Sequence, residues 1–126
     1  MNETQKPLVL VADDDPDILS LIALRLERSG YDVLAAEDGR QALTTALERV
    51  PDVAVLDVTM PKLDGYEVTK LLRDDARTRH MPVILLTARV QESDIARGIE
   101  AGADDYVTKP FSTQELRDRV QAVLGR

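Results

Sequence analysis

Residues Val53–Val58 read VAVLDV, a continuous run of apolar side chains that is interrupted only by Asp57 near its end. The run is rich in β-branched residues and does not alternate with polar ones, which predicts a strand buried on both faces of a parallel sheet. Similar runs occur elsewhere along the chain: LVLVA (Leu8–Ala12), PVILLTA (Pro82–Ala88) and the shorter DYVT (Asp105–Thr108). A further run, YDVLAA (Tyr31–Ala36), is weaker, which favours an edge position in the sheet.

Apolar residues at helical spacing occupy the segments that follow these runs. The residues expected on the apolar faces of five successive helices are Ile18, Leu21, Ile22 and Leu26, then Ala42, Leu43, Ala46 and Leu47, then Val68, Leu71 and Leu72, then Ile95 and Ile99, and finally Leu116, Val120, Val123 and Leu124. Pro16 suits a first helical turn, and Gly30 and Gly102 suit helix ends. Ser112 and Glu115 form a capping-box pattern. Strands that alternate with helices predict a doubly wound α/β fold, in which a parallel sheet lies between two layers of helices.

Length and composition limit the classes of function. With 126 residues the chain can build one hydrophobic core but not two, so we expect a single domain over residues 1–126. Its 23 acidic and 16 basic residues give a net charge of −7, which argues against direct binding to nucleic acid or anionic lipid. The absence of cysteine excludes disulfides and thiolate chemistry. No apolar run approaches a membrane span and no signal core precedes the first strand, so a cytoplasmic location is expected.

Charged and polar residues follow the ends of four predicted strands: Asp13 and Asp14 after the first, Asp57 at the third, Thr87 at the fourth and Lys109 after the fifth. In an open doubly wound sheet the carboxyl ends of the strands meet at the edge where ligands bind. Carboxylates about 4 Å apart repel by roughly 4 kcal/mol per pair at an effective dielectric of ~20, so this acidic group requires compensation. Ligands that offer only oxygen suit Mg²⁺, and a lysine can supply the remaining positive charge.

A carboxylate beside such charges can also attack phosphorus, because aspartyl phosphates are a known form of covalent intermediate. Asp57 suits this role, since it ends an apolar run that is expected to lie inside the sheet. Acidic residues are more often solvated loop charge, which is the simpler interpretation of Asp15 and Asp17. The expected convergence of Asp13, Asp14 and Asp57 on one edge favours a functional site for those three.

The motifs LVLVADDDPDI, VAVLDVTMPKLDGYE, VILLTA and GADDYVTKPF follow one another along nearly the whole chain. With them the chain resembles the receiver domains of two-component response regulators. The resemblance implies a flavodoxin-like three-layer sandwich of five βα units with the parallel strand order 2-1-3-4-5. It also implies phosphorelay signalling, in which a sensor histidine kinase donates a phosphoryl group and an output domain or downstream protein responds. Each motif alone is common, but their order and spacing together are specific.

The same resemblance assigns the residues of a phosphorylation site. Asp57 would be the phosphoacceptor, and Lys109 would bind an oxygen of the phosphoryl group. Asp13 and Asp14 would hold Mg²⁺ together with Asp57 and the backbone carbonyl of Thr59, with Mn²⁺ as an alternative metal.

Further positions match the parts of a receiver that change on phosphorylation. Thr87 would be the switch hydroxyl that moves toward the phosphoryl group, and Tyr106 would be the aromatic that turns inward with it. The Lys109–Pro110 bond would be cis. Gly65 would serve the turn beside the site.

The segment LLTARVQESDIARGIEAGADDYVTKPF is most similar to receivers that are joined to winged-helix DNA-binding domains. Such receivers pair through the fourth helix, the fifth strand and the fifth helix, and Asp105, Glu115 and Arg119 match the charges of that surface. Ile95 and Gln121 depart from the pattern, because basic residues are usual at both positions. A homodimer through this surface is one alternative, and an apolar contact made by Ile95 is another.

Two other functions compete with the phosphorylation switch. A pseudo-receiver would keep the fold as an interaction module without a working site, although the full set of acids, hydroxyl and lysine argues against it. A phosphatase with an aspartyl-phosphate intermediate would need a second Asp two residues after Asp57, where Thr59 stands. We therefore expect no enzymatic turnover of external substrates, and only autocatalytic phosphotransfer and autodephosphorylation.

Overall fold

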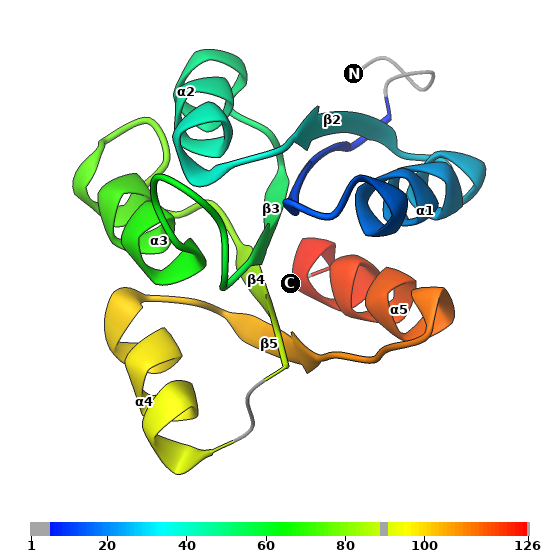
Figure 1. Cartoon of the computed structure of the whole chain (residues 1–126). Coiled ribbons are helices and arrows are strands. Elements are labelled where there is room, and N and C mark those ends of the chain that lie inside the picture. Colours follow the sequence, from blue (N-terminus) through cyan, green and yellow to red (C-terminus); the bar gives the residue numbers. More distant parts are fainter. Residues whose placement is uncertain (1–5, 89–90, 126) are drawn as a thin grey trace.

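The computed structural model describes residues 6–88 and 91–125, and these contain one five-stranded parallel sheet. Its strands are β1 (Leu8–Ala12), β2 (Asp32–Ala36), β3 (Val53–Asp57), β4 (Val83–Thr87) and β5 (Asp105–Thr108). Their order is β2-β1-β3-β4-β5, which confirms the predicted doubly wound α/β class and strand order (Figure 1). The weaker run forms β2 at one edge of the sheet, as expected.

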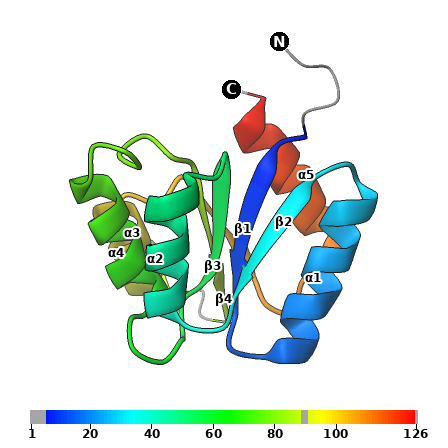
Figure 2. The same cartoon turned by 90° about the horizontal axis from the view of Figure 1, so that it is seen from above.

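A helix follows each strand and completes the three-layer sandwich. The helices are α1 (Pro16–Arg28), α2 (Gly39–Arg49), α3 (Gly65–Asp74), α4 (Glu92–Ala101) and α5 (Thr113–Leu124). Figures 1 and 2 show α1 and α5 on one face of the sheet and α2, α3 and α4 on the other. This division follows from right-handed crossovers on either side of the point where the strand order reverses.

Alternate side chains of each strand enter two separate cores. In β1, Val9 and Val11 pack with residues of α1 and α5, whereas Leu10 and Ala12 pack with residues of α2 and α3. Every residue of β3 and β4 is buried. The central strands are therefore apolar on both faces, which explains why VAVLDV shows no polar alternation.

Side chains cap the N-terminal ends of four of the five helices that residues 6–88 and 91–125 form. Pro16 occupies the first turn of α1, and the carboxylate of Asp15 accepts the N–H groups of Asp17 and Ile18. Ser112 Oγ accepts the N–H of Glu115 at 3.0 Å, which is half of the predicted capping box. A reciprocal capping box is present at α3, where Asp64 and Glu67 each accept the other's backbone N–H. Asp15 thus has a structural role and is not merely solvated loop charge.

Two residues predicted on apolar helix faces lie largely in solvent: Leu21 of α1 is 57% exposed and Leu71 of α3 is 41% exposed. Their helices are held by the neighbouring buried residues Ile22 and Leu72.

Helix α4 departs further from the predicted packing. Ile95 and Ile99 were expected on its apolar face, but the side chain of Ile99 is 70% exposed and Ile95 is only partly buried. The residues that α4 buries are the small Gly98 and Ala101. A Cβ at position 98 would lie 3.3 Å from Leu85 Cδ1, so the helix approaches β4 through its glycine.

None of the helices within residues 6–88 and 91–125 combines the length and the apolar character that spanning a membrane requires.

Candidate functional site

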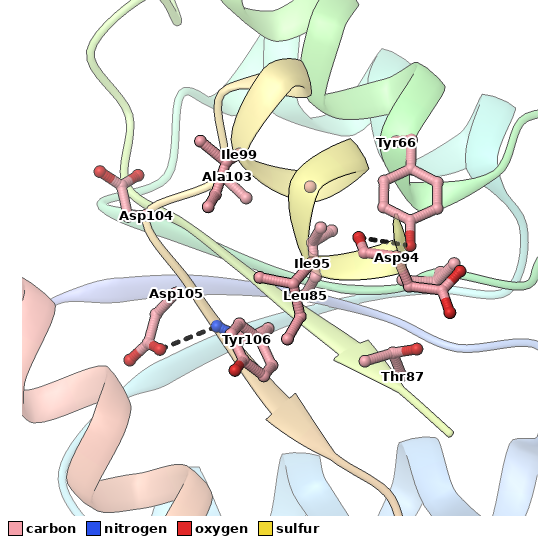
Figure 3. A pocket seen from close by; sticks show the side chains of 12 residues that line it. Tyr66, Leu85, Thr87, Asp94, Ile95, Ile99, Ala103, Asp104, Asp105 and Tyr106 are labelled. Atoms are coloured by element: carbon pink, nitrogen blue, oxygen red, sulfur yellow. Dashed lines mark hydrogen bonds between the residues drawn. The ribbon is translucent and has the colours of Figure 1, made fainter. Parts of the chain in front are cut away.

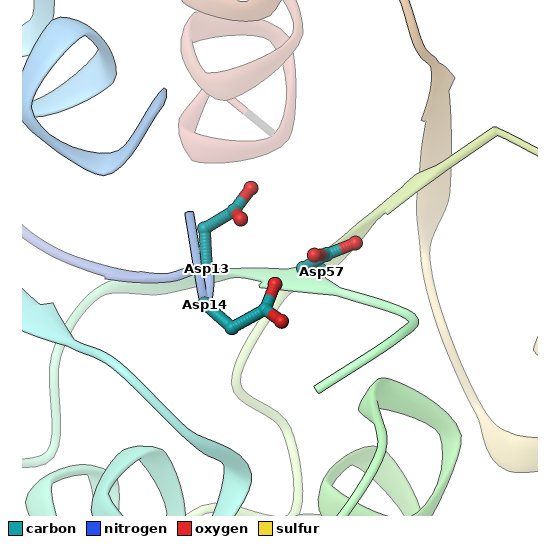
Figure 4. A group of neighbouring side chains, drawn as sticks. All are labelled: Asp13, Asp14 and Asp57. Atoms are coloured by element: carbon teal, nitrogen blue, oxygen red, sulfur yellow. The ribbon is translucent and has the colours of Figure 1, made fainter. Parts of the chain in front are cut away.

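The predicted acidic residues meet at the carboxyl edge of the sheet. Strands β1 and β3 are neighbours, with Ala12 opposite Leu56, so the residues that follow these two positions lie side by side. Figure 4 shows the carboxylates of Asp13 and Asp14, from the loop after β1, beside that of Asp57 at the end of β3. One carboxylate oxygen from each of the three lies within 4.8 Å of the others. The convergence predicted from the sequence is therefore present.

These three carboxylates differ in burial. Asp13 is fully buried, Asp57 is 5% exposed and Asp14 is exposed. Local hydrogen bonds fix the buried pair, because Asp13 Oδ1 accepts the N–H of Asp15 at 3.0 Å and Asp57 Oδ1 accepts that of Thr59 at 3.4 Å. Burial of two carboxylates is costly unless positive charge is supplied nearby.

Lys109 supplies part of that charge from the end of β5. Its Nζ lies 3.1 Å from Asp13 Oδ2 and 3.3 Å from Asp57 Oδ2. The backbone N–H of Lys109 donates to the carbonyl of Thr87 at 2.7 Å, which holds the lysine beside the end of β4. One ammonium cannot neutralise two buried carboxylates and the adjacent Asp14, so net negative charge is left at the site.

Electrostatics at the site reflect this imbalance. Burial and the neighbouring charge of Asp13 raise the pKa of Asp57 to about 6, against the opposing effects of Lys109 and the N–H of Thr59. Burial opposes the charge on Lys109, but its hydrogen bond to Asp13 and its attraction to Asp57 outweigh burial and leave the pKa of the lysine raised. The lysine therefore stays charged, and the crowding of negative charge makes ionisation of Asp57 less favourable.

The donor set fits a hard divalent cation. Asp13, Asp14 and Asp57 offer only oxygen, and a cation between them would offset the charge that Lys109 leaves unbalanced. Thr59 is exposed in the loop after β3, close enough to Asp57 for its N–H to reach that carboxylate. The proposed ligand role of its carbonyl stays a prediction.

The two predicted switch residues border one cavity of about 200 Å³ between α4 and the sheet. Thr87 is 7% exposed at the end of β4, and Tyr106 is 38% exposed on β5. Figure 3 shows both side chains around the cavity with Ile95 of α4. The structure thus brings Thr87 and Tyr106 to the same space, next to the acidic edge but not within it.

Two further expectations concern the backbone around the site. The Lys109–Pro110 peptide is cis, as the resemblance implied. Gly65 begins α3 and closes the loop after β3 by donating its N–H to the Val58 carbonyl at 2.9 Å, and a Cβ there would lie 2.6 Å from the carbonyl oxygen of Asp57. Glycine at this position is required by the close approach of α3 to the end of β3.

An arginine on α3 was missed in the sequence. The guanidinium of Arg73 donates to backbone carbonyls of Met81 and Gly102 and pairs with Asp104 at 2.9 Å. Met81 lies in the connection that follows α3 and Gly102 lies in the turn after α4, and in both residues the acceptor is a main-chain oxygen. A pattern of side-chain types therefore does not predict these contacts.

Comparison with known proteins agrees with this geometry. Residues 9–121 match the family described as the response regulator receiver domain. The chain is 51% identical over 118 residues to the alkaline phosphatase synthesis transcriptional regulatory protein PhoP of Bacillus subtilis, which covers 94% of this chain and 48% of the relative. It is 46% identical over 120 residues to the DNA-binding dual master transcriptional regulator RpaA of Synechocystis sp., covering 95% of this chain and 50% of that protein. The chain thus spans about half the length of the curated relatives that it matches.

A solved structure with a related sequence has the same fold. The receiver domain of the sensor histidine kinase PA1611 from Pseudomonas aeruginosa PAO1 is 33% identical, with a TM-score of 0.89 over 97% of this chain and 100% of that one. It holds a magnesium ion coordinated in its active-site cleft. The fold, the acidic edge and these matches agree, and the chain belongs to the receiver domains of two-component response regulators.

Proposed function

We propose that this domain, over residues 1–126, is a phosphorylation switch in which Asp57 accepts a phosphoryl group. The observation that carries the proposal is the sharing of one lysine by two buried carboxylates, with Lys109 Nζ 3.1 Å from Asp13 and 3.3 Å from Asp57. A site left so negative attracts a divalent cation, and a lysine already at the acceptor carboxylate can bind the incoming phosphoryl oxygens.

Asp13, Asp14, Asp57 and the backbone carbonyl of Thr59 would hold Mg²⁺, with Mn²⁺ as an alternative. The acid-only donor set and the magnesium in the related receiver of PA1611 support this assignment. When bound, the cation would neutralise charge on the acceptor and on the phosphoryl oxygens, as Lewis acids do in phosphoryl transfer.

The transfer itself requires little covalent chemistry from the protein. An oxygen of Asp57 attacks phosphorus and forms an acyl phosphate, while the bond from phosphorus to the leaving group breaks and its electron pair stays on that group. The leaving group is the imidazole nitrogen of a phosphohistidine in a kinase, or acetate when acetyl phosphate is the donor. Lys109 donates hydrogen bonds to a phosphoryl oxygen, and Asp13 holds the lysine in place.

Phosphorylation would then change the surface of α4, β5 and α5. It replaces one negative charge by nearly two and adds acceptor oxygens, which can draw Thr87 toward the site. Support comes from the cavity that Thr87 and Tyr106 share, because it leaves room for the ring of Tyr106 to turn inward. The result is a two-state surface that an output domain or a partner protein can read.

The partners follow from the family. A sensor histidine kinase would be the donor, and an output region or downstream protein would be the receptor of the signal, since the relatives PhoP and RpaA are regulators of transcription. This domain, with a net charge of −7, would not bind nucleic acid itself. We place it in the cytoplasm, with a homodimer through α4, β5 and α5 as one form. The pair of Arg119 with Asp105, at 2.8 Å, joins α5 to β5 on that surface.

Intact-mass measurement after incubation with acetyl phosphate and Mg²⁺ tests the proposal. The wild-type chain should gain one phosphoryl group, and Asp57→Asn should gain none. Asp74→Asn, which removes an exposed carboxylate at the end of α3, is the matched control and should behave as the wild type. A folded wild type that never gains the mass would favour the pseudo-receiver, and steady hydrolysis of external phosphomonoesters would favour the phosphatase.

A further inference from the structure

The two ends of α4 are capped differently. At its C-terminal end Gly102 adopts a positive φ of 101°, and its N–H donates to Gly98 and Ile99 carbonyls at 3.1 and 3.0 Å. The N–H of Ala103 also donates to Gly98 at 3.0 Å, so the last turn is closed by the main chain. Across residues 6–88 and 91–125 no side chain caps the N-terminal end, where Gln91 precedes the helix.

Arg73 of α3 fastens the C-terminal end of α4. Its Nε donates to the Gly102 carbonyl at 3.0 Å, its Nη1 to the Met81 carbonyl at 2.6 Å, and its Nη2 to Asp104 Oδ2 at 2.9 Å. Asp104 Oδ2 also accepts the N–H of Val83 at 2.8 Å. The Arg73 and Asp104 side chains are 22% and 27% exposed. The guanidinium therefore joins the turn after α4 to α3 and to the start of β4.

The N-terminal half of α4 is held to α3 by weaker contacts. Tyr66 donates its hydroxyl to the Asp94 carbonyl at 3.3 Å, and the guanidinium of Arg97 lies 4.5 Å from the centre of the Tyr66 ring. Arg97 is 3.7 Å from Asp64, and its side chain is 58% exposed. Charged hydrogen bonds that are shielded from water are stronger than exposed ion pairs and exposed cation–π contacts. The C-terminal attachment is thus the firmer one.

A cavity beneath α4 leaves space into which the helix can move. This cavity of about 200 Å³ extends along α4 from Asp94 and Ile95 to Ile99 and the turn after the helix, and Thr87 and Tyr106 border it from the sheet. Space alone therefore does not decide which end of α4 moves, and the difference in attachment does. Figure 3 shows the side chains of Asp94, Ile95 and Ile99 on one side of this space and those of Thr87 and Tyr106 on the other. The cavity adjoins the residue expected to move first on phosphorylation.

We propose that Arg73 is a positioning residue for the switch: it fixes the C-terminal end of α4 as a pivot, so that phosphorylation moves the N-terminal half. The inference rests on the proposed function, because it concerns which end of α4 moves when Asp57 is phosphorylated. The attachment depends on the forked shape of the guanidinium, which donates to the carbonyls of Arg79, Met81 and Gly102 and to the carboxylate of Asp104 at once.

Backbone amide chemical shifts with beryllofluoride and Mg²⁺ test the pivot, since beryllofluoride stands for the phosphoryl group on Asp57. In the wild type, perturbations in α4 should be concentrated in residues 92–98 and small in residues 100–104. Perturbations of equal size in both segments would overturn the proposal. Absence of any perturbation around Asp57 would instead contradict the proposed function, so the two failures are distinguishable.

Arg73→Gln should spread the beryllofluoride perturbations into residues 100–104. It should also speed amide hydrogen exchange at Gly102 and Ala103 by roughly 10- to 100-fold, because charged hydrogen bonds are lost there. Arg77→Gln is the matched control: it breaks the ion pair with Asp75 at 2.9 Å in the same part of the molecule but should leave the α4 profile unchanged.

Arg73→Lys keeps the positive charge but not the fork, and should give an intermediate profile. If Arg73→Gln does not fold, the chemical-shift profiles of Arg73→Lys and of the wild type still test whether Arg73 holds the C-terminal end of α4. A wild-type pattern in either folded Arg73 variant would contradict the pivot, and so would the same spreading in Arg77→Gln.

Discussion

Helices α4 and α5 flank the same end of the sheet on opposite faces, yet they are held in very different ways (Figure 1). Helix α5 buries Leu116, Val120 and Val123 against the sheet, whereas α4 buries only Gly98 and Ala101. Most helical stability in proteins comes from packing of an apolar face, so α5 should be held more firmly to the sheet than α4. The difference indicates that α4 can shift on the sheet while α5 and the acidic edge keep their positions.

Truncation in the two helices should show the largest difference. Leu116→Ala, at a side chain that is 1% exposed, should lower the free energy of unfolding by about 2–4 kcal/mol. Ile99→Ala, at a side chain that is 70% exposed, should change it by less than about 0.5 kcal/mol. Chemical denaturation measures both values. Similar losses in the two variants would show that α4 is packed as firmly as α5.

Substitution of Asp57 at the acidic edge should have the next largest effect on the free energy of unfolding. Without divalent metal at pH 7, Asp57→Asn should raise the free energy of unfolding by about 1–3 kcal/mol, because the folded state then no longer holds a crowded carboxylate. Asp74→Asn provides the baseline for loss of an exposed charge. A less stable Asp57→Asn would mean that the buried pair is compensated better than its geometry indicates.

The direction of the pH dependence follows from the raised pKa of about 6 for Asp57. Because this carboxyl binds its proton more tightly when folded than when unfolded, its charged form destabilises the fold fully above about pH 6. The cost disappears as the pH falls through the unfolded value of about 4. The advantage of Asp57→Asn should therefore shrink between pH 7 and pH 4, as thermal melts across that range would reveal. An advantage that grows on acidification would contradict the assignment.

Mg²⁺ should stabilise the wild type through binding to the same edge. At ten times its dissociation constant the gain is about 1.4 kcal/mol, seen as a higher melting temperature. Asp13→Asn should lose most of this gain, whereas Asp17→Asn, at an exposed acid in the first turn of α1, should keep it. A melting temperature indifferent to Mg²⁺ in the wild type would favour the pseudo-receiver.

Gly98→Ala should change the free energy of unfolding only slightly and tests how tightly α4 packs against β4. Alanine favours a helix over glycine by up to about 1 kcal/mol, but the new Cβ would lie 3.3 Å from Leu85 Cδ1. Leu85 borders the cavity and can shift slightly, so we expect a net gain of about 0.5 kcal/mol. A loss above about 1 kcal/mol in denaturation would show that the contact between α4 and β4 is tight.

The sequence was sufficient to predict the strands and the meeting of three aspartates at one edge of the sheet. Runs such as VAVLDV have no interpretation other than a doubly buried strand once helices separate them, and parallel strands bring their carboxyl ends to one edge. Asp13, Asp57 and Lys109 could therefore be placed together before any coordinates. The capping box at Asp64 and Glu67 has the same spacing as the pattern at Ser112 and was equally open to prediction.

The packing of α4 and the contacts of Arg73 could not be predicted, because both depend on which residues of other elements they face. Helical spacing shows that Ile95 and Ile99 are near one another on α4, but not that the helix approaches β4 through Gly98 and leaves Ile99 in solvent. The contacts of Arg73 could not be predicted for a related reason, because every residue type has a main-chain carbonyl and the sequence does not show which of them an arginine will reach. Leu21 of α1 and Leu71 of α3 are exposed for the same reason as Ile99, because helical spacing does not show how far the partner surface extends around a helix.

Mapping of the acyl phosphate identifies which aspartate accepts the phosphoryl group. The wild-type chain is phosphorylated with acetyl phosphate and Mg²⁺, reduced with borohydride, which converts a phosphorylated aspartate to homoserine, and digested for peptide mass spectrometry. We expect homoserine at position 57 and at no other aspartate. Homoserine at position 13 or 14 in place of 57, or none in a folded chain, would contradict it.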